Sequence, residues 1–273
     1  MKAQLLSCAK INLDLKILER QTNGLHEIES NMQFIDLSDE IIIDLNASCY
    51  QLDVDGEIDC SEADNLVTKA HRALQNEVNQ DLPCKIMIKK NIPLQSGLGG
   101  GSSNSATVLL ALNKLFRLTL TLEKLIKIGL KLGSDIPFFI RGQSGLVFGT
   151  GELFKPKTYP LKDFSLLVPD MKSSTKDLFN TLDDQKNSLR HSSVNNFESV
   201  FFRKYELIKS TLDNLDIKNT IFLSGTGSTV FFEDQGFAEL DKIAEKIPPN
   251  WRSFKCKALQ YSPIYKQWGV AKR

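Results

Sequence analysis

The stretch from Asn91 to Thr107, NIPLQSGLGGGSSNSAT, limits what this chain can fold into more than any other part of the sequence. It holds four glycines within five positions, namely Gly97, Gly99, Gly100 and Gly101. Glycine lets the backbone adopt positive φ and leaves no Cβ in the way of an incoming group. A helix that begins at the following serines presents unpaired N–H groups and the positive end of its dipole. The stretch is therefore predicted to bind an anion, above all phosphate.

A Gly/Ser tract can also be a flexible linker. Here the strand-like CKIMIKK (84–90) precedes the loop and a helical pattern (106–118) follows it. Because predicted secondary structure flanks the tract closely on both sides, a flexible linker is disfavoured. The chain has no GxxxxGK(S/T) motif, no GxGxxG after a strand, and no HRD and DFG pair. We therefore expect backbone amides and serines to hold the phosphate, without a lysine in the loop.

Length and pattern together indicate an α+β protein. A chain of 273 residues is long for one core, so one large or two small domains are expected. Strand and helix patterns alternate irregularly, which favours α+β over a doubly wound sheet. The pattern is interrupted around 155–160, so we predict domains at 1–155 and 156–273. In the first domain, a β-rich region (28–45) is predicted to break at the polar Ser38-Asp39-Glu40. Apolar spacing predicts a helix over residues 63–78, and Thr121 is predicted to cap a helix that follows the loop helix.

The composition excludes several classes of partner. A formal net charge of +1 gives no global field that attracts nucleic acid or a membrane surface. No apolar run approaches the roughly 20 residues that span a bilayer, and polar residues interrupt residues 1–18, so a signal-peptide core is absent. We expect a cytoplasmic protein. The five cysteines are scattered without a CxxC pair, which argues against structural zinc and favours reduced thiols.

A lysine near the start and a carboxylate midway along the chain are candidates for chemistry. Lys10 and Asn12 alternate with apolar residues on a predicted strand, so they point to the same side. A solvated edge strand would show the same pattern. Asp135 stands between a glycine turn and the apolar PFF, where it is either a simple cap or a partly desolvated group that needs a partner. We predict that Lys10 is that partner.

The segment LSGTGS (223–228) is a second loop of small residues, between two predicted strands. A tight β-turn explains this segment as well as ligand binding does. Two such loops in one chain nevertheless favour a shared nucleotide site. His26 carries little weight by itself, and the pair Lys89-Lys90 either screens phosphate charge or simply flanks a strand.

Several motifs in this sequence resemble those of a known family. PLQSGLGGGSSNSAT resembles the phosphate loop of the GHMP kinases (galactokinase, homoserine kinase, mevalonate kinase and phosphomevalonate kinase), and LSGTGSTVFF resembles their C-terminal glycine motif. AKINLDL, NGLHEIES, EADNLV, GLGGGSSN and LGSDIPFFIRG together resemble the branch of this family that acts on a CDP-linked methylerythritol. The matches run in the expected order from residue 9 to about residue 232, so they cover most of the chain.

The resemblance implies transfer of the ATP γ-phosphate to the 2-hydroxyl of CDP-methylerythritol, in the non-mevalonate (MEP) route of isoprenoid biosynthesis. It implies a two-domain fold, with an N-terminal half like domain 2 of ribosomal protein S5 and a ferredoxin-like C-terminal half. Mg²⁺ is expected with ATP. No acidic residue lies in the loop, so Ser102 and Ser103 are the only local candidates for a protein ligand, and none is assigned. The expected partner is this small-molecule substrate, with neither nucleic acid nor membrane, and the expected state is a monomer or weak homodimer.

The resemblance also assigns residues. The catalytic pair falls on Lys10 and Asp135, and the substrate-binding residues are Lys10, Asn12, His26 and Asp135. Phe179 is predicted as a second aromatic platform for cytosine, outside the motifs that carry the resemblance. The ATP-binding residues are Asn65, Lys90, Pro93, Leu94, Gly97, Leu98, Gly99, Gly100, Gly101, Ser102 and Ser103.

Two positions depart from the family pattern. Leu25 stands where members usually carry an aromatic residue that can stack on cytosine, and Gln95-Ser96 stands where glycines are common, which is expected to narrow the loop without abolishing it. Two other functions stay open. The nearest is another GHMP kinase, acting on homoserine or a mevalonate derivative. The second is a nucleotide-binding module without catalysis, which the joint presence of Lys10 and Asp135 disfavours.

Overall fold

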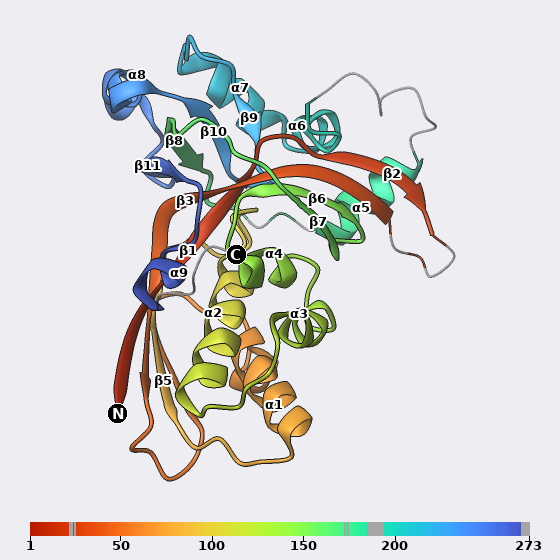
Figure 1. The fold of residues 1–273 in the computed structure, drawn as a ribbon. Helices are drawn as coiled ribbons and strands as arrows, with labels where there is room; N and C mark the ends of the chain where they lie inside the picture. Colours follow the sequence, from red (N-terminus) through yellow and green to blue (C-terminus); the bar gives the residue numbers. More distant parts are fainter. Residues whose placement is uncertain (22–23, 25, 172, 174, 185–193, 269–273) are drawn as a thin grey trace.

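The computed structural model describes residues 1–21, 24, 26–171, 173, 175–184 and 194–268. Long strands run through the molecule, and the helices of the N-terminal half gather beside them (Figure 1). Strands and helices mix irregularly along the chain, as the α+β prediction requires. In the described part, no helix combines the length and the apolar character needed to cross a membrane.

The sheet of the N-terminal half is built around one long strand, β3 (His26–Asp44). It pairs antiparallel with β1, β2, β5 and β6, and β4 adds parallel to β5. The bounds of these strands are β1 Lys2–Asn12, β2 Lys16–Arg20, β4 Gln51–Asp55, β5 Lys85–Lys89, β6 Gly145–Gly149 and β7 Leu153–Pro156. The predicted break at Ser38–Glu40 is wrong, because β3 continues through it with Asp39 pointing into the interior.

Four helices cover one face of this sheet (Figure 1). They are α1 Leu66–Val78, α2 Gly100–Leu115, α3 Leu122–Leu130 and α4 Ile136–Arg141, and a 3-10 turn, η1 Glu62–Asp64, precedes them. Thr121 caps α3 as predicted, since its side chain accepts from the backbone N–H of Lys124 at 3.2 Å. Buried side chains of β1, β3, β5 and the four helices form one core, which holds α2 with its N-terminus at the glycine loop.

The C-terminal half forms a second core together with Leu15 and Ile17, and its strands extend the same sheet through β11. Its strands are β8 Asp163–Val168, β9 Phe222–Leu223, β10 Val230–Glu233 and β11 Arg252–Leu259. Its helices are α5 Thr175–Asp184, α6 Glu198–Lys204, α7 Glu206–Asn214, α8 Ala238–Ile243 and α9 Pro263–Trp268, with 3-10 turns η2 Gln235–Phe237 and η3 Ala244–Lys246. Strand β11 pairs with both β8 and β3, and α9 packs on β1. The division at 155/156 stays a prediction.

Candidate active site

The glycine stretch forms a tight loop that leads directly into α2. Gly97 (φ +78°) and Gly99 (φ +74°) occupy the left-handed region, and Gly99 is the N-cap of α2. A Cβ at Gly99 would lie 2.8 Å from the Phe139 ring and 3.3 Å from Cε of Lys10. Only glycine therefore fits between these two side chains. The helix begins at Gly100, before the predicted start at the serines, and its N-terminus faces an open cavity of about 610 Å³.

The second glycine loop interlocks with the first one. Ser224 Oγ donates to the carbonyl oxygen of Gly97 at 3.0 Å and accepts from the backbone N–H of Asn12 at 3.4 Å. The backbone N–H of Thr229 donates to the carbonyl oxygen of Ser96 at 3.1 Å. Residues 225–227 line the same cavity as the first loop. The structure thus brings the two loops together at one cavity.

Lys10 and Asp135 meet at this cavity. Lys10 Nζ lies 3.7 Å from Oδ2 of Asp135, with the lysine side chain 4% exposed and the aspartate side chain 29% exposed. The register of β1 against β3 shifts between Cys8 and Lys10, and the freed N–H of Lys10 donates to the carbonyl oxygen of Leu98 at 3.1 Å. The carboxylate of Asp135 makes no capping hydrogen bond to α4. The predicted pairing with Lys10 is therefore present, and the side-chain cap is not.

A chain of hydrogen bonds orients the Lys10 ammonium. Its Nζ donates to Oδ1 of Asn12 at 2.5 Å, and Nδ2 of Asn12 donates to Oγ of Ser30 at 2.8 Å. Ser30 in turn donates to the carbonyl oxygen of Asp14 at 2.6 Å. Burial lowers the pKa of Lys10, and the nearby carboxylate of Asp135 opposes that shift. The side chain of Asn12 thus fixes the position of the ammonium.

The far end of the cavity is apolar and aromatic. Leu15, Ile17, Ile28, Phe179 and Phe197 line it. The rings of His26 and Phe179 stack with centroids 4.8 Å apart and planes 16° apart, while Phe197 meets Phe179 edge-on. Two substrate residues predicted from the sequence, His26 and Phe179, thus lie together. Leu25, where an aromatic residue was expected, lies outside the described residues.

The predicted loop residues divide between the cavity and the core. Gly97, Gly99 and Ser102 line the cavity. The side chain of Leu98 is buried in the core, and the hydroxyl of Ser103 donates inward to the carbonyl oxygen of Cys8 at 2.6 Å. Of the two loop serines considered for Mg²⁺, only Ser102 therefore presents its side chain to the cavity.

The other predicted ATP residues surround the loop. Pro93 accepts from the Ser96 hydroxyl at 2.8 Å through its carbonyl oxygen, and Leu94 is half-buried beside it. Asn65 caps α1 by accepting from the N–H of Val67 at 2.9 Å, and the next residue, Leu66, packs against Gly101. The ammonium of Lys90 lies beside Gly100. Their contact with ATP stays a prediction.

Sequence reasoning missed three side chains around the loops. Gln95 adopts φ +47°, lines the cavity and donates to Asp59. Ser224 joins the two loops, and its place in the second small-residue segment was a usable signal. Asp39 is fully buried below the first loop. No local signal indicates its role, because it stands in a polar run that predicts a strand break.

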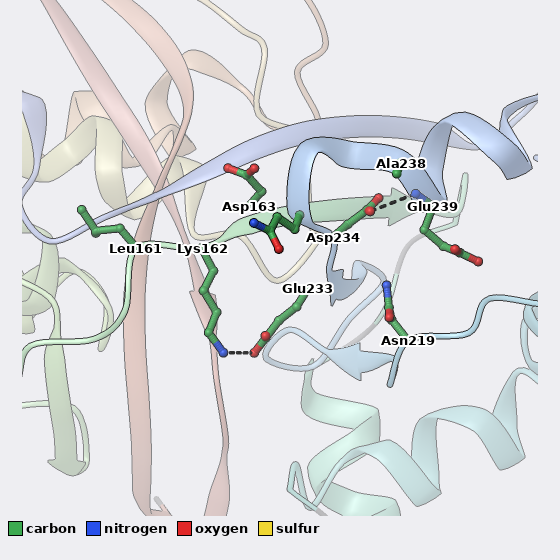
Figure 2. Close-up of a pocket in the computed structure, with 9 residues that line it drawn as sticks. Leu161, Lys162, Asp163, Asn219, Glu233, Asp234, Ala238 and Glu239 are labelled. Carbon is green, nitrogen blue, oxygen red and sulfur yellow. Dashed lines mark hydrogen bonds and ion pairs between the residues drawn. The ribbon is translucent and has the colours of Figure 1, made fainter.

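A second hollow, of about 660 Å³, lies in the C-terminal half (Figure 2). Lys162 and Glu233 form an ion pair across it at 2.6 Å. The carboxylate of Asp234 accepts from the N–H groups of Glu239 and Leu240 at 2.9 and 2.8 Å. The interactions of these carboxylates are with other parts of the C-terminal half and stabilise the fold. Neither glycine loop lines the hollow. Across the described ranges, no group of three His, Cys, Asp or Glu is arranged to hold a metal.

A cavity lined by two glycine loops, with the Lys10 ammonium and the Asp135 carboxylate beside it, is the arrangement expected of a phosphotransferase of the small-molecule kinase class. The model of the GHMP kinases N terminal domain matches residues 65–143. A crystal structure of 4-(cytidine 5'-diphospho)-2C-methyl-D-erythritol kinase superposes with a TM-score of 0.77 at 26% identity, covering 94% of this chain and 99% of that one. The Methanococcus jannaschii mevalonate kinase (TM-score 0.66, 16% identity, 95% and 98% coverage) shares the fold.

Curated relatives give the closer relationship. The 4-diphosphocytidyl-2-C-methyl-D-erythritol kinase of Francisella tularensis subsp. novicida is 36% identical, over 93% of this chain and 96% of its own. The enzyme of the same name from Haemophilus ducreyi is 32% identical, over 96% of both chains. The chain therefore belongs to the GHMP kinases, and within them to the family of 4-diphosphocytidyl-2-C-methyl-D-erythritol kinases. The predicted two-domain GHMP fold and the ATP-dependent small-molecule kinase class are thereby confirmed.

Proposed function

We propose that this chain transfers the γ-phosphate of ATP to the 2-hydroxyl of 4-diphosphocytidyl-2-C-methyl-D-erythritol, a step of MEP isoprenoid biosynthesis. The observation that carries the proposal is the Lys10–Asp135 pair, 3.7 Å apart at the mouth of the amide-lined cavity. The curated relatives with this name match along nearly the whole chain, which supports this substrate over homoserine or mevalonate.

The reaction asks the protein chiefly for positioning and for neutralisation of charge. The amides of the loop from Gly97 to Ser102 hold the phosphates at the positive end of α2. Asp135 orients the 2-hydroxyl and takes its proton as the oxygen–phosphorus bond forms and the bond from the γ-phosphorus to the β-phosphate oxygen breaks. The Lys10 ammonium stabilises the negative charge that develops on the attacking oxygen.

Mg²⁺ and ATP complete the proposal. Mg²⁺ would enter with ATP, held chiefly by water and phosphate oxygens, and would neutralise phosphate charge. The hydroxyl of Ser102 is the loop oxygen that faces the cavity, so one weak protein ligand fits this mode of binding. A cage of carboxylates is not required.

The apolar end of the cavity suits the cytosine of the substrate. Base–aromatic stacking contributes roughly 1–3 kcal/mol per base. Phe179 lines the cavity and presents such a ring, supported edge-on by Phe197. His26 stacks on the same ring and supplies polar ring nitrogens next to it.

Replacement of Asp135 by Asn tests the chemistry. The change keeps size and polarity but removes the proton acceptor, so turnover should fall by roughly two to four orders of magnitude with nucleotide affinity unchanged. ADP release would be followed with CDP-methylerythritol, homoserine and mevalonate as acceptors. Asp213→Asn, on the exposed surface of α7, is the matched control. Near-normal turnover of Asp135→Asn would remove this residue from its role.

The acceptor panel separates the remaining alternatives. Turnover with homoserine or mevalonate in place of CDP-methylerythritol would assign the chain to a different substrate. If the chain binds nucleotide but releases no ADP with any of the acceptors, it is a nucleotide-binding module without catalytic activity.

A further inference from the structure

Strand β3 carries a carboxylate, Asp39, that has no solvent exposure. Its Oδ1 accepts from the backbone N–H groups of Asn91 and Ile92 at 2.7 and 2.8 Å. Its Oδ2 accepts from Nδ2 of Asn104 at 2.9 Å. The same oxygen also accepts from Nζ of Lys90. A buried carboxylate is costly unless it is paired and hydrogen-bonded. The four donors meet this requirement, so the side chain is held in one place.

These donors come from both sides of the phosphate loop. Asn91 and Ile92 lie where the chain leaves β5 and enters the loop, and Asn104 belongs to the second turn of α2. One side chain therefore ties the entry of the loop to the helix that follows it. Amides that bind phosphate must be fixed in advance, because reorganisation on binding would reduce affinity.

The ammonium of Lys90 lies next to the start of α2. Its Nζ is 3.3 Å from the position of a Cβ at Gly100, and its side chain is 10% exposed. The N-terminus of a helix carries partial positive charge, so an ammonium at this place is repelled unless a negative charge offsets it. Asp39 supplies that charge. An anion held by the loop amides would lie close to this ammonium, which does not itself line the cavity.

We propose that Asp39 is a positioning residue of the nucleotide site, which acts on ATP through Lys90 and the loop amides. The inference rests on the proposed function only in taking ATP as the anion. An Asn at this position would turn its NH₂ group either toward Lys90 and Asn104 or toward the two backbone N–H groups. In either orientation an NH₂ group faces other hydrogen-bond donors. The Lys90 ammonium and the loop amides are then no longer held by the same side chain.

The test compares Asp39→Asn with a matched buried aspartate. Asp234 is 3% exposed and accepts from Ser165 Oγ at 2.7 Å and from two backbone N–H groups, beside the hollow of Figure 2. Calorimetric titration with a non-hydrolysable ATP analogue measures the nucleotide site without reference to the acceptor. Asp39→Asn should weaken this binding roughly 10- to 100-fold, the effect of one lost charge-assisted hydrogen bond. Asp234→Asn should lower thermal stability and leave the affinity unchanged.

Kinetics give a second readout that a purely structural loss would not produce. The KM for ATP should rise in Asp39→Asn by the same factor, while the KM for CDP-methylerythritol stays within about twofold of wild type. Lys90→Met removes the ammonium and leaves the other three donors on Asp39. Because Asp39 acts partly through Lys90, the affinity loss of the double variant should be smaller than the product of the single losses.

Three results would overturn the proposal. These are wild-type affinity in Asp39→Asn, an equal loss in Asp234→Asn, or single losses that multiply in the double variant. If Asp39→Asn does not fold, Lys90→Met decides alone, and wild-type affinity in that variant rejects the proposal. A wild-type chain that binds the analogue but does not phosphorylate CDP-methylerythritol would refute the proposed function and leave the role of Asp39 to the binding measurement.

Discussion

Replacement of Gly97 by Ala tests how the two glycine loops depend on each other. A Cβ at this position would lie 2.1 Å from the carbonyl oxygen of Ser224, whereas real Cβ contacts stay above 3.0 Å. The loops must therefore separate by about 0.9 Å, which stretches the Ser224–Gly97 and Thr229–Ser96 hydrogen bonds of 3.0 and 3.1 Å past the roughly 3.5 Å where such bonds are lost.

The magnitude follows from these contacts. A left-handed alanine costs about 1–2 kcal/mol, and two lost hydrogen bonds cost about 1 kcal/mol each. Gly97→Ala should therefore lower the free energy of unfolding by roughly 3–4 kcal/mol. Gly236 is the matched control, because its φ is +66° and a Cβ there meets nothing within 4 Å. Gly236→Ala should lower the free energy of unfolding only by the cost of the left-handed alanine. Both variants reduce the conformational entropy of the unfolded chain equally, so this effect cancels when they are compared.

Urea unfolding of both variants, together with ADP release, is the assay. The difference between them should be about 2 kcal/mol, and only Gly97→Ala should lose most of its kinase activity. If the two variants agree within about 0.5 kcal/mol, or if Gly97→Ala keeps full activity, the two loops do not depend on each other in this way.

Two further predictions concern buried ionisable groups. Burial lowers the pKa of Lys10 below 10.5, so the unfolded chain binds more protons as the pH nears that value. The free energy of unfolding of the wild type should thus rise relative to Lys10→Met as the pH rises toward 10.5, and a constant difference in urea unfolding contradicts this. Burial raises the pKa of Cys8, Cys84 and Cys256 to about 12. A thiol reagent should therefore modify exposed Cys49 first, and early loss of a buried thiol from the native protein would refute the reasoning.

Local signals predicted much of the fold because they act over a few residues. The helix of residues 66–78, the cap at Thr121 and the strand before the glycine loop all follow from spacing and capping chemistry. The short helices α6 and α9 were not predicted, because six or seven residues carry too little periodicity and tertiary packing stabilises them. Strand β11 pairs with both halves of the chain, a contact between distant segments that no local pattern indicates.

The sequence by itself determined the backbone chemistry of the site. Glycines at 97 and 99 are required by positive φ and by close neighbours, and a helix start behind them has the amides for an anion. Only the tertiary structure decided which side chains serve that loop. It placed Ser224 between the loops and buried Asp39 below them, and it confirmed the predicted pairing of Lys10 with Asp135 from distant segments. The physical reason is that φ preferences belong to each residue, whereas the pairing of buried charges depends on which strands and helices meet.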